Sequence, residues 1–353
     1  MSLKNKIVKK ISLEGSLSIS KFMEMCMWDT EEGYYFRKNI IGEKGDFTTS
    51  PELSQTFGEL IGIWSLSCHI NKLKNEKLSL LELGPGKGTL IDDGLRAINK
   101  IVKNEFSPET YLLEKSPILQ EIQKEKLEKH SIQWINDIGE MPEKPLIIIA
   151  NEFFDSLPIN QYLRVQEGWK ERKIGLKDSN LCITLDKRIL KFKANYFQST
   201  PLGEIIEYSY DTIKIFSKIC DHIKEFGSIA LIIDYGEISG FGDTLQAIKN
   251  HNSNFILDNP GESDLSSHVN FGILANIALE RNLRVSPIIE QYKFLKNLGI
   301  ETRMKRLIEN KPTNKLIAEI KGIRKLIDPE NMGKLFKVMA FSNRKNIEIE
   351  GFC

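Results

Sequence analysis

Residues 80–90 read LLELGPGKGTL, an apolar run that contains Glu82 and closes with three glycines, Gly84, Gly86 and Gly88. The run from Leu78 to Leu83 predicts a buried strand, and the residues from about Thr89 predict a helix. Glycine supplies positive φ angles at no steric cost, so the turn between them can bring its backbone close to a ligand. This order of strand, glycine-rich turn and helix predicts an α/β fold with a nucleotide-type cofactor at the turn.

The spacing of the glycines narrows the class of cofactor. The dinucleotide fingerprint is G-x-G-x-x-G, whereas here the third glycine comes one residue early. This disfavours an NAD-dependent dehydrogenase, and G-P-G-K-G after an acid-bearing strand resembles the first motif of S-adenosyl-L-methionine (SAM) methyltransferases. A tight turn that binds nothing would show the same glycines, so the later segments have to decide.

Three further strands are predicted to end in polar side chains. Residues 110–115, TYLLEK, contain Glu114, which is placed to accept the hydroxyls of a ribose. The strand 132–135 leads into Asn136 and Asp137, which are placed to meet an adenine amino group. The apolar run PLIIIA is followed by three polar residues, Asn151, Glu152 and Asp155. Ligands bind at the carboxyl ends of strands in open α/β sheets, so these side chains predict one shared pocket.

Charge and cysteine content exclude several classes of protein. The 49 basic and 48 acidic side chains give a net charge of +1, which does not predict nucleic-acid binding. The five cysteines include no C-x-x-C pair and the histidines show no ligand spacing, so no metal is assigned. No apolar stretch approaches the roughly 18 residues that a membrane span needs.

The chain is expected to begin with a cap and continue into a core. Residues 1–75 predict a helical N-terminal cap with a glycine-rich loop at 42–51. Residues 76–290 predict the core, with an antiparallel excursion at about 161–200 and a long site-lining loop at 236–271.

The C-terminal part predicts a helical insertion at 291–330 and a last core strand within 331–353. Inside the core, Glu204–Phe226 predicts one long amphipathic helix that ends at Gly227. Residues 284–289 predict a strand before the helical insertion.

Seven segments together carry a family resemblance that extends almost from end to end. They are GDFTTSPELSQTFGELIGIW (45–64), LLELGPGKGTL (80–90), ANEFFDSLPINQY (150–162), DYG (234–236), GDTLQA (242–247), PGESDLSSHVNF (260–271) and FLKNLGIETR (294–303). In this order they resemble the MidA family. That family is similar to SAM-dependent methyltransferases, and its mitochondrial members are arginine methyltransferases that assist assembly of respiratory complex I.

The resemblance implies a Rossmann-like, seven-stranded methyltransferase sheet with an N-terminal cap, helical insertions and SAM as cofactor. It implies a cofactor pocket formed by Glu82, Gly84, Gly86, Gly88, Glu114, Asp137 and Asn151. The N-terminal loop with Asp46, Phe47, Thr48 and Thr49 would close over that pocket. A surface-lying first helix is favoured over a targeting segment, because the basic N-terminus lacks arginine and a cleavage-type apolar core. We therefore expect a cytoplasmic protein of bacterial type, or a mitochondrial matrix protein if the source is eukaryotic.

Glu152 and Asp155 are the best candidates for holding an acceptor. Guanidinium is a poor nucleophile because its charge is delocalised, so an arginine acceptor needs carboxylates that bind it through paired hydrogen bonds. The alternative is that Asp155 caps a turn while Glu152 is merely exposed. Asp264 and His268 form a second candidate pair, for which a capping acid and a satisfied histidine are an equal alternative.

Two functions from different classes follow. The first is a protein arginine methyltransferase whose partner is a protein substrate, such as a subunit of respiratory complex I or a related subunit. The second is a non-catalytic assembly or binding factor that has kept the methyltransferase fold. The three glycines and the acids after the strands favour the enzyme.

Overall fold

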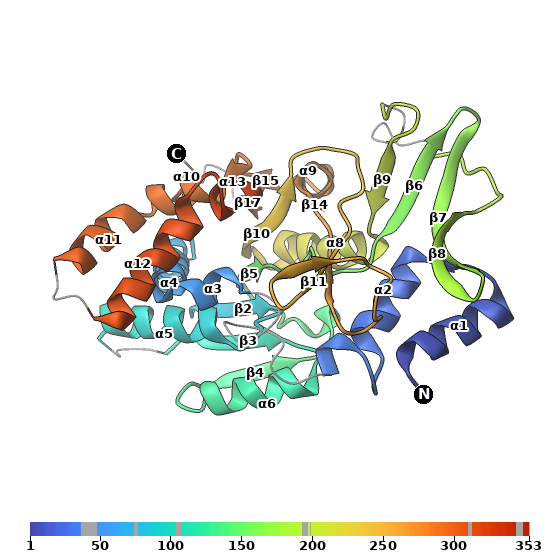
Figure 1. The fold of residues 1–353 in the computed structure, drawn as a ribbon. Coiled ribbons are helices and arrows are strands. Elements are labelled where there is room, and N and C mark those ends of the chain that lie inside the picture. The colour runs from blue at the N-terminus through green and yellow to red at the C-terminus, as the bar shows by residue number, and fades with distance from the viewer. Residues whose placement is uncertain are drawn as a thin grey trace.

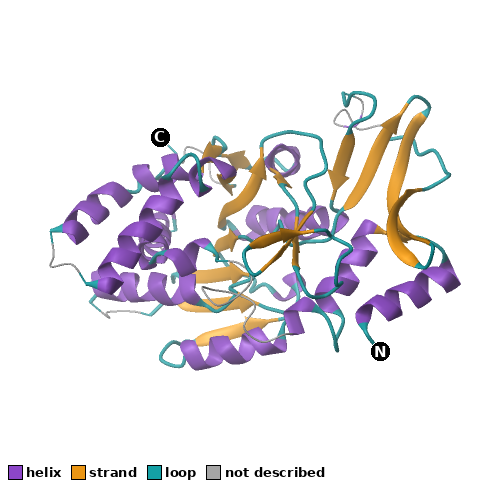
Figure 2. Ribbon diagram, in the orientation of Figure 1, coloured by secondary structure: helices purple, strands orange, loops and turns teal. Residues whose placement is uncertain are grey.

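The computed structural model describes residues 1–36, 48–73, 77–103, 107–192, 197, 199–309, 313–343 and 349–352. Its centre is a mostly parallel sheet (Figures 1 and 2). The strands follow the order β15 (Arg284–Val285), β17 (Phe336–Ser342), β10 (Ile229–Glu237), β5 (Ile147–Asn151), β2 (Ser79–Leu83), β3 (Glu109–Leu113) and β4 (Ile132–Ile135). Strand β17 runs antiparallel to β10 and β15, while the pairs from β10 to β4 are parallel. The predicted Rossmann-like α/β sheet is confirmed.

The edge of the sheet differs from the prediction at one strand. The segment expected as one strand at 284–289 forms two short pieces, β15 and β16 (Ile289–Glu290), which both pair with β17. Pro287 lies between them, and proline cannot donate a ladder hydrogen bond. A further short strand, β14 (Val269–Asn270), lies beside the end of β10.

Each core strand supplies side chains to both faces of the sheet. On β5, Ile147 and Ile149 face one apolar cluster, while Ile148 faces the other. The first cluster includes α4 (Gln55–Lys72), α5 (Thr89–Ile101) and α10 (Gln291–Asn297). The second includes α8 (Tyr210–Phe226) and α9 (Phe271–Glu280). Burial on both faces explains why these strands are continuous apolar runs in the sequence.

A second, antiparallel sheet lies beyond the central one. Its order is β1 (Leu17–Ser18), β7 (Gly168–Lys177), β6 (Asn160–Val165) and β9 (Ile205–Tyr208), with β8 (Asn180–Leu185) beside β7. The predicted excursion is thus an antiparallel sheet. Helices α1 (Leu3–Glu14) and α2 (Ile19–Trp28) pack against it, as Figure 1 shows in blue beside green strands.

The predicted long helix at 204–226 is wrong in its first turn. Residues 205–208 form strand β9, in which buried Ile206 pairs with Tyr162, and the helix begins only at Tyr210. Ser209 caps it by accepting a hydrogen bond from the Thr212 amide. Gly227 ends it in the left-handed conformation, as predicted.

The stretch 236–271 is more ordered than a loop. It contains a small sheet of β11 (Gln246–Lys249), β12 (Asn252–Asn254) and β13 (Asp264–Ser266). Asn250 and His251 join β11 to β12 with φ angles of 50° and 61°, as a two-residue hairpin turn requires.

The C-terminal part contains the helices that the sequence predicts. After α10 come α11 (Ile300–Ile308), α12 (Asn314–Ile327) and the short α13 (Met332–Leu335). Helix α12 packs beside the four-residue α3 (Ser50–Leu53) and α4. Among the described residues, the remaining elements are α6 (Pro117–Lys126), η1 (Tyr34–Phe36) and η2 (Ile138–Glu140). Within the described ranges, no helix is long and apolar enough to cross a membrane.

Candidate active site

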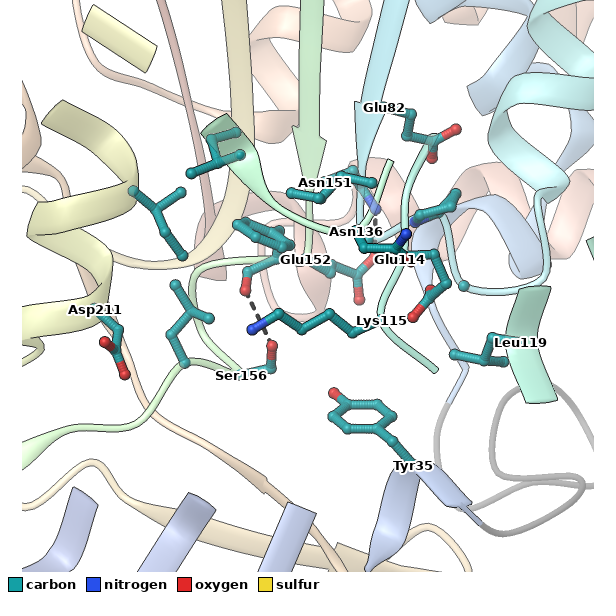
Figure 3. Close-up of a pocket in the computed structure, with 18 of the residues that line it drawn as sticks. Tyr35, Glu82, Glu114, Lys115, Leu119, Asn136, Asn151, Glu152, Ser156 and Asp211 are labelled. Atoms are coloured by element: carbon teal, nitrogen blue, oxygen red, sulfur yellow. Dashed lines mark hydrogen bonds between the residues drawn. The ribbon is translucent and has the colours of Figure 1, made fainter. Parts of the chain in front are cut away.

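A cavity of about 510 Å³ lies at the carboxyl ends of β2, β3, β4 and β5 (Figure 3). The strand order reverses between β2 and β5, and such a switch point is where open α/β sheets bind ligands. Its walls include many of the residues that the sequence singled out: Glu82, Gly84, Gly86, Glu114, Asp137, Asn151, Glu152 and Thr49.

The glycine-rich turn forms one wall of this cavity. Gly84 and Gly86 have φ angles of 61° and 55°, which side-chain-bearing residues rarely adopt. A Cβ atom at Gly84 would lie 2.8 Å from the ring of Phe153, so only glycine fits there. Gly88 is the N-cap residue of α5 and does not line the cavity. A Cβ atom at Gly88 would lie 3.0 Å from Cδ1 of Leu127.

Glu114 lies directly after β3 and is almost fully buried. Its Oε1 accepts a hydrogen bond from the Ser116 amide at 2.8 Å, and its Oε2 accepts one from Gln123 Nε2 at 3.2 Å. Gln123 also donates to the Gly86 carbonyl at 2.7 Å, which ties the acid to the glycine-rich turn. Burial raises the pKa of Glu114 to about 7.

Two buried polar atoms beside the cavity lack partners among the described residues. They are Oε2 of Glu82 and Oδ1 of Asn151. Burial raises the pKa of Glu82 to about 8. Buried acceptors are normally hydrogen-bonded, so these two atoms fit a ligand that brings its own donors.

Asp137 lines the cavity but is engaged elsewhere. Its carboxylate accepts a hydrogen bond from the Gly139 amide at 2.7 Å. It also forms an ion pair with Lys218 at 3.2 Å. These contacts lower its pKa. The adjacent Asn136 also lines the cavity, so the end of β4 reaches the position expected of it.

Glu152 points into the cavity from a strained backbone position (Figure 3). Its φ is 51°, an unusual value for a residue other than glycine, and its amide donates to the Ile233 carbonyl at 2.9 Å. Its Oε1 accepts hydrogen bonds from the Ser50 amide at 2.7 Å and from Asn151 Nδ2 at 3.1 Å. Burial raises the pKa of the carboxyl group.

Asp155 does not line the cavity wall with Glu152. It is half-buried, and burial together with the charges of Asp234, Asp264 and Glu152 raises its pKa well above the usual range. Its carbonyl accepts a hydrogen bond from the Ser267 amide at 2.9 Å, which brings the end of β13 alongside. The structure therefore gathers four acids from three distant segments, Glu152 and Asp155, Asp234, and Asp264.

Asp234 lies in β10, directly after its apolar run at 229–233, and received no role from the sequence. It is fully buried, and its carboxylate accepts hydrogen bonds from the amides of Phe153 at 3.2 Å, Phe154 at 2.8 Å and Tyr235 at 2.9 Å. Burial, together with nearby Glu152, raises its pKa to about 7. An acid that closes a wholly apolar strand was the signal that could have identified it.

Asp264 and His268 do not form one site. Asp264 lies in strand β13, and in an extended chain four residues span about 13 Å. His268 instead lines a second, small cavity of about 90 Å³. Its ring centroid lies 4.2 Å from that of Tyr235, and burial lowers its pKa. The alternative of a helix-capping acid is also wrong, because the segment is not helical.

The N-terminal segment contributes a wall that the sequence placed only in part. Asp46 and Phe47 lie outside the described residues; Thr49 lines the cavity and Thr48 does not. Tyr35 also lines it, with its ring 4.8 Å from that of Trp28, while Tyr34 is buried in the core. Further lining residues that the sequence did not single out are Glu52, Lys115 and Ser156.

Comparison with known proteins agrees with this geometry. The family model of S-adenosyl-L-methionine-dependent methyltransferases matches residues 60–289. Protein arginine methyltransferase NDUFAF7 of Xenopus laevis is 32% identical, with 98% of this chain and 86% of that protein covered. The protein of the same name from Homo sapiens is 31% identical, with 97% and 83% covered.

A solved structure shares the whole fold. It is a protein of Burkholderia thailandensis bound to S-adenosyl-homocysteine, with a TM-score of 0.84, 22% identity, and coverage of 99% of this chain and 94% of that one. The match of the family model over most of the chain, and relatives above 30% identity along nearly all of it, place this protein in the family of SAM-dependent methyltransferases.

Proposed function

We propose that this methyltransferase modifies an arginine side chain of a protein, and that the acceptor is a subunit of respiratory complex I or a related subunit. The relatives named protein arginine methyltransferase NDUFAF7 support the arginine acceptor. The resemblance to the MidA family supports a subunit of respiratory complex I, or a related subunit, as the acceptor protein. The observation that carries the proposal is a group of four acids, Asp155 with the nearby Glu152, Asp234 and Asp264, of which Glu152 lines the cavity.

The acids suit a guanidinium group for an electrostatic reason. Asp234, Asp264 and Glu152 all lie close enough to Asp155 for their charges to raise its pKa. A cation bound at Glu152 would offset this repulsion and favour the ionised carboxylates. A carboxylate also accepts two parallel N–H bonds from guanidinium, which holds the acceptor in a fixed orientation. A lysine ammonium lacks this planar fork.

The remaining walls suit the cofactor. When bound, SAM supplies a methyl group that its sulfonium has already activated, so the protein has mainly to orient the acceptor and exclude water. Gly84 and Gly86 let the turn approach the cofactor closely, and Glu114 is placed to accept hydroxyl donors. The unpartnered oxygens of Glu82 and Asn151 would accept from an ammonium group.

The same relatives support a proposal for the compartment if the source is eukaryotic. Both NDUFAF7 proteins carry the word mitochondrial in their names. We place this protein in the mitochondrial matrix if its source is eukaryotic, and in the cytoplasm if its source is bacterial.

The decisive experiment identifies the methylated residue. Lysate from a strain lacking the protein is incubated with methyl-labelled SAM and either the purified protein or its Glu152→Gln variant. Peptide mass spectrometry should find methylarginine with the wild-type protein and at least about 10² less with the variant. Label on lysine would overturn the arginine acceptor. Saturable SAM binding by titration without any label transfer would favour the non-catalytic binding factor.

A further inference from the structure

The short helix α3 (Ser50–Leu53) forms part of the cavity wall and also contacts the C-terminal helices. Pro51 and Glu52 line the cavity, together with Thr49 just before the helix. On its other side α3 packs against α12, and Figure 1 shows it between α12 and the central sheet. Any shift of α3 would therefore move the cavity wall.

On the cavity side, α3 holds two chemically important groups. The Ser50 amide donates to Oε1 of Glu152 at 2.7 Å. Glu52 accepts a hydrogen bond from the Thr89 hydroxyl, at the start of α5, and pairs with Lys87 of the glycine-rich turn at 3.6 Å. One four-residue helix thus connects the acceptor carboxylate with the turn that approaches the cofactor.

On the outer side, a single carboxylate of α12 binds the residues that follow α3. Oε1 of Glu319 accepts from Ser54 Oγ at 2.6 Å, from the Thr56 amide at 2.9 Å and from Thr56 Oγ1 at 2.7 Å. Its Oε2 accepts from the Gln55 amide at 3.1 Å. Ser54, at the N-cap position of α4, makes no side-chain cap of its own, so Glu319 caps this helix from another part of the chain.

The backbones of α12 and α3 are also in direct contact. A Cβ atom at Gly322, one turn after Glu319, would lie only 1.9 Å from the Leu53 carbonyl oxygen. Burial acts to raise the pKa of Glu319, but its hydrogen bonds to Ser54 and Thr56 outweigh this and lower it. The carboxylate is therefore ionised at neutral pH and a strong acceptor.

We infer that Glu319 is a positioning residue of the methyltransferase: by binding Ser54, Gln55 and Thr56 it holds α3 where Ser50 orients Glu152 and Glu52 supports the glycine-rich turn. The helical insertion at 291–330 is on this account part of the active-site architecture. The cofactor part of the inference is independent of the acceptor. The Glu152 part rests on the proposed function.

The chain offers a matched control. Glu59, on the same helix α4, pairs with Arg303 of α11 at 3.2 Å, so it too joins α4 to the helical insertion. Within α4, Glu59 also accepts a hydrogen bond from Gln55 Nε2 at 2.7 Å, and among the described residues no hydrogen bond or ion pair joins its side chain to α3. Glu59→Ala therefore removes another link between α4 and the helical insertion, and leaves the bonds of Glu319 to Ser54 and Thr56 in place.

The test compares Glu319→Ala, Glu319→Gln and Glu59→Ala in the full chain, at a temperature well below the midpoint of unfolding of each. Titration with S-adenosyl-homocysteine should show affinity about tenfold weaker in Glu319→Ala, an intermediate loss in Glu319→Gln, and a change within twofold in Glu59→Ala. Affinity within twofold of wild type in both Glu319 variants, with only the melting temperature lowered, would overturn the inference. If Glu319→Ala does not fold, Glu319→Gln against Glu59→Gln decides in the same way.

A pH profile separates the two parts of the inference. The Ser50 amide stabilises the ionised form of Glu152, so releasing α3 should raise the pKa of Glu152. If methyl transfer needs this carboxylate ionised, the acid limb of the pH–activity profile should lie at higher pH in Glu319→Gln than in Glu59→Gln. This shift supports the full inference. An unmoved acid limb beside weakened S-adenosyl-homocysteine binding overturns the Glu152 part of the inference while the cofactor part stands. The acceptor role itself is tested separately, by the rate of methyl transfer in Glu152→Gln.

Discussion

Replacement of Glu152 by glutamine tests whether this side chain holds the acceptor or the cofactor. The substitution keeps the shape of the side chain, and the amide oxygen can still accept from the Ser50 amide and from Asn151 Nδ2. What changes is the other terminal atom, which becomes an N–H donor without charge. We expect SAM affinity to stay within about twofold of wild type, while methyl transfer collapses.

The size of the loss follows from the bonds that change. A hydrogen bond to a charged group contributes about 1.5–3 kcal/mol, and each 1.4 kcal/mol corresponds to about a factor of ten. The new N–H group would also face the donors of a guanidinium, which adds repulsion. A fall of about 10² or more in the rate at saturating SAM is therefore expected.

Stability provides the internal control. The pKa of Glu152 is raised in the folded protein, so ionisation above its ordinary pKa of 4.5 costs folding free energy. Removing the charge should leave the free energy of unfolding at pH 8 unchanged or increased. Radiometric transfer to the identified acceptor measures the rate, and calorimetric titration measures SAM binding. Full activity in Glu152→Gln at saturating SAM would refute the acceptor role and direct attention to Asp155 and Asp264.

Four further predictions concern the cofactor side. Gly86→Val should abolish SAM binding in a protein that still folds by circular dichroism, because a β-branched residue rarely adopts the φ of 55° found there; retained affinity would rule out this turn as the cofactor wall. Glu114→Ala should weaken SAM by about 1.5–3 kcal/mol in a calorimetric titration, and a change within error would place hydroxyl recognition elsewhere. SAM affinity should rise from about pH 6 to about pH 8, because the pKa values of Glu114 and Glu82 are about 7 and about 8 and a cationic ligand favours their ionised forms. Calorimetric titrations in buffers of different ionisation enthalpy should therefore detect proton release on binding. Proton uptake would contradict this prediction. In the ligand-free protein, rising pH should lower the free energy of unfolding, because a carboxyl group with a raised pKa destabilises the fold between its ordinary pKa of 4.5 and about 8. Glu82→Gln should therefore melt at a higher temperature than wild type at pH 8 but not at pH 4.

The core strands were predictable because burial on both faces leaves a clear pattern. Strand β4 has the bounds expected of it, and β2, β3 and β5 differ by one or two residues. Strand β9 was missed because the apolar residues of IIEY continue into the amphipathic pattern of α8 without a proline or glycine between them. The hairpin of β11 and β12 was missed because exposed Asn and Ser residues carry no apolar alternation.

The site was predictable where it depends on strand ends and not where it depends on distant segments. Glu114, Asn151 and Glu152 reach the cavity because they lie at or just after the carboxyl ends of parallel strands of one sheet. The approach of Asp264 to Asp155 depends on how a separate three-stranded sheet docks against the core, which local pattern does not encode. The bonds from Glu319 to Ser54 and Thr56 join residues more than 260 positions apart, and no spacing rule relates them.

Among the four acids, Asp234 stabilises the backbone, whereas Glu152 and Asp155 are the candidates for contact with a bound cation. Asp234 accepts hydrogen bonds from three backbone amides, and two of these belong to Phe153 and Phe154. These amides follow directly after Glu152, so Asp234 is placed to stabilise the turn that keeps Glu152 at its strained φ of 51°. Its burial is then explained by the backbone that it satisfies. Glu152 and Asp155 keep raised pKa values that disfavour their ionised forms and weaken the fold at neutral pH. Such a cost in folding free energy is expected at a site whose carboxylates are stabilised only when a cation binds. The charge of Glu152, more than its shape, should therefore decide the rate of methyl transfer.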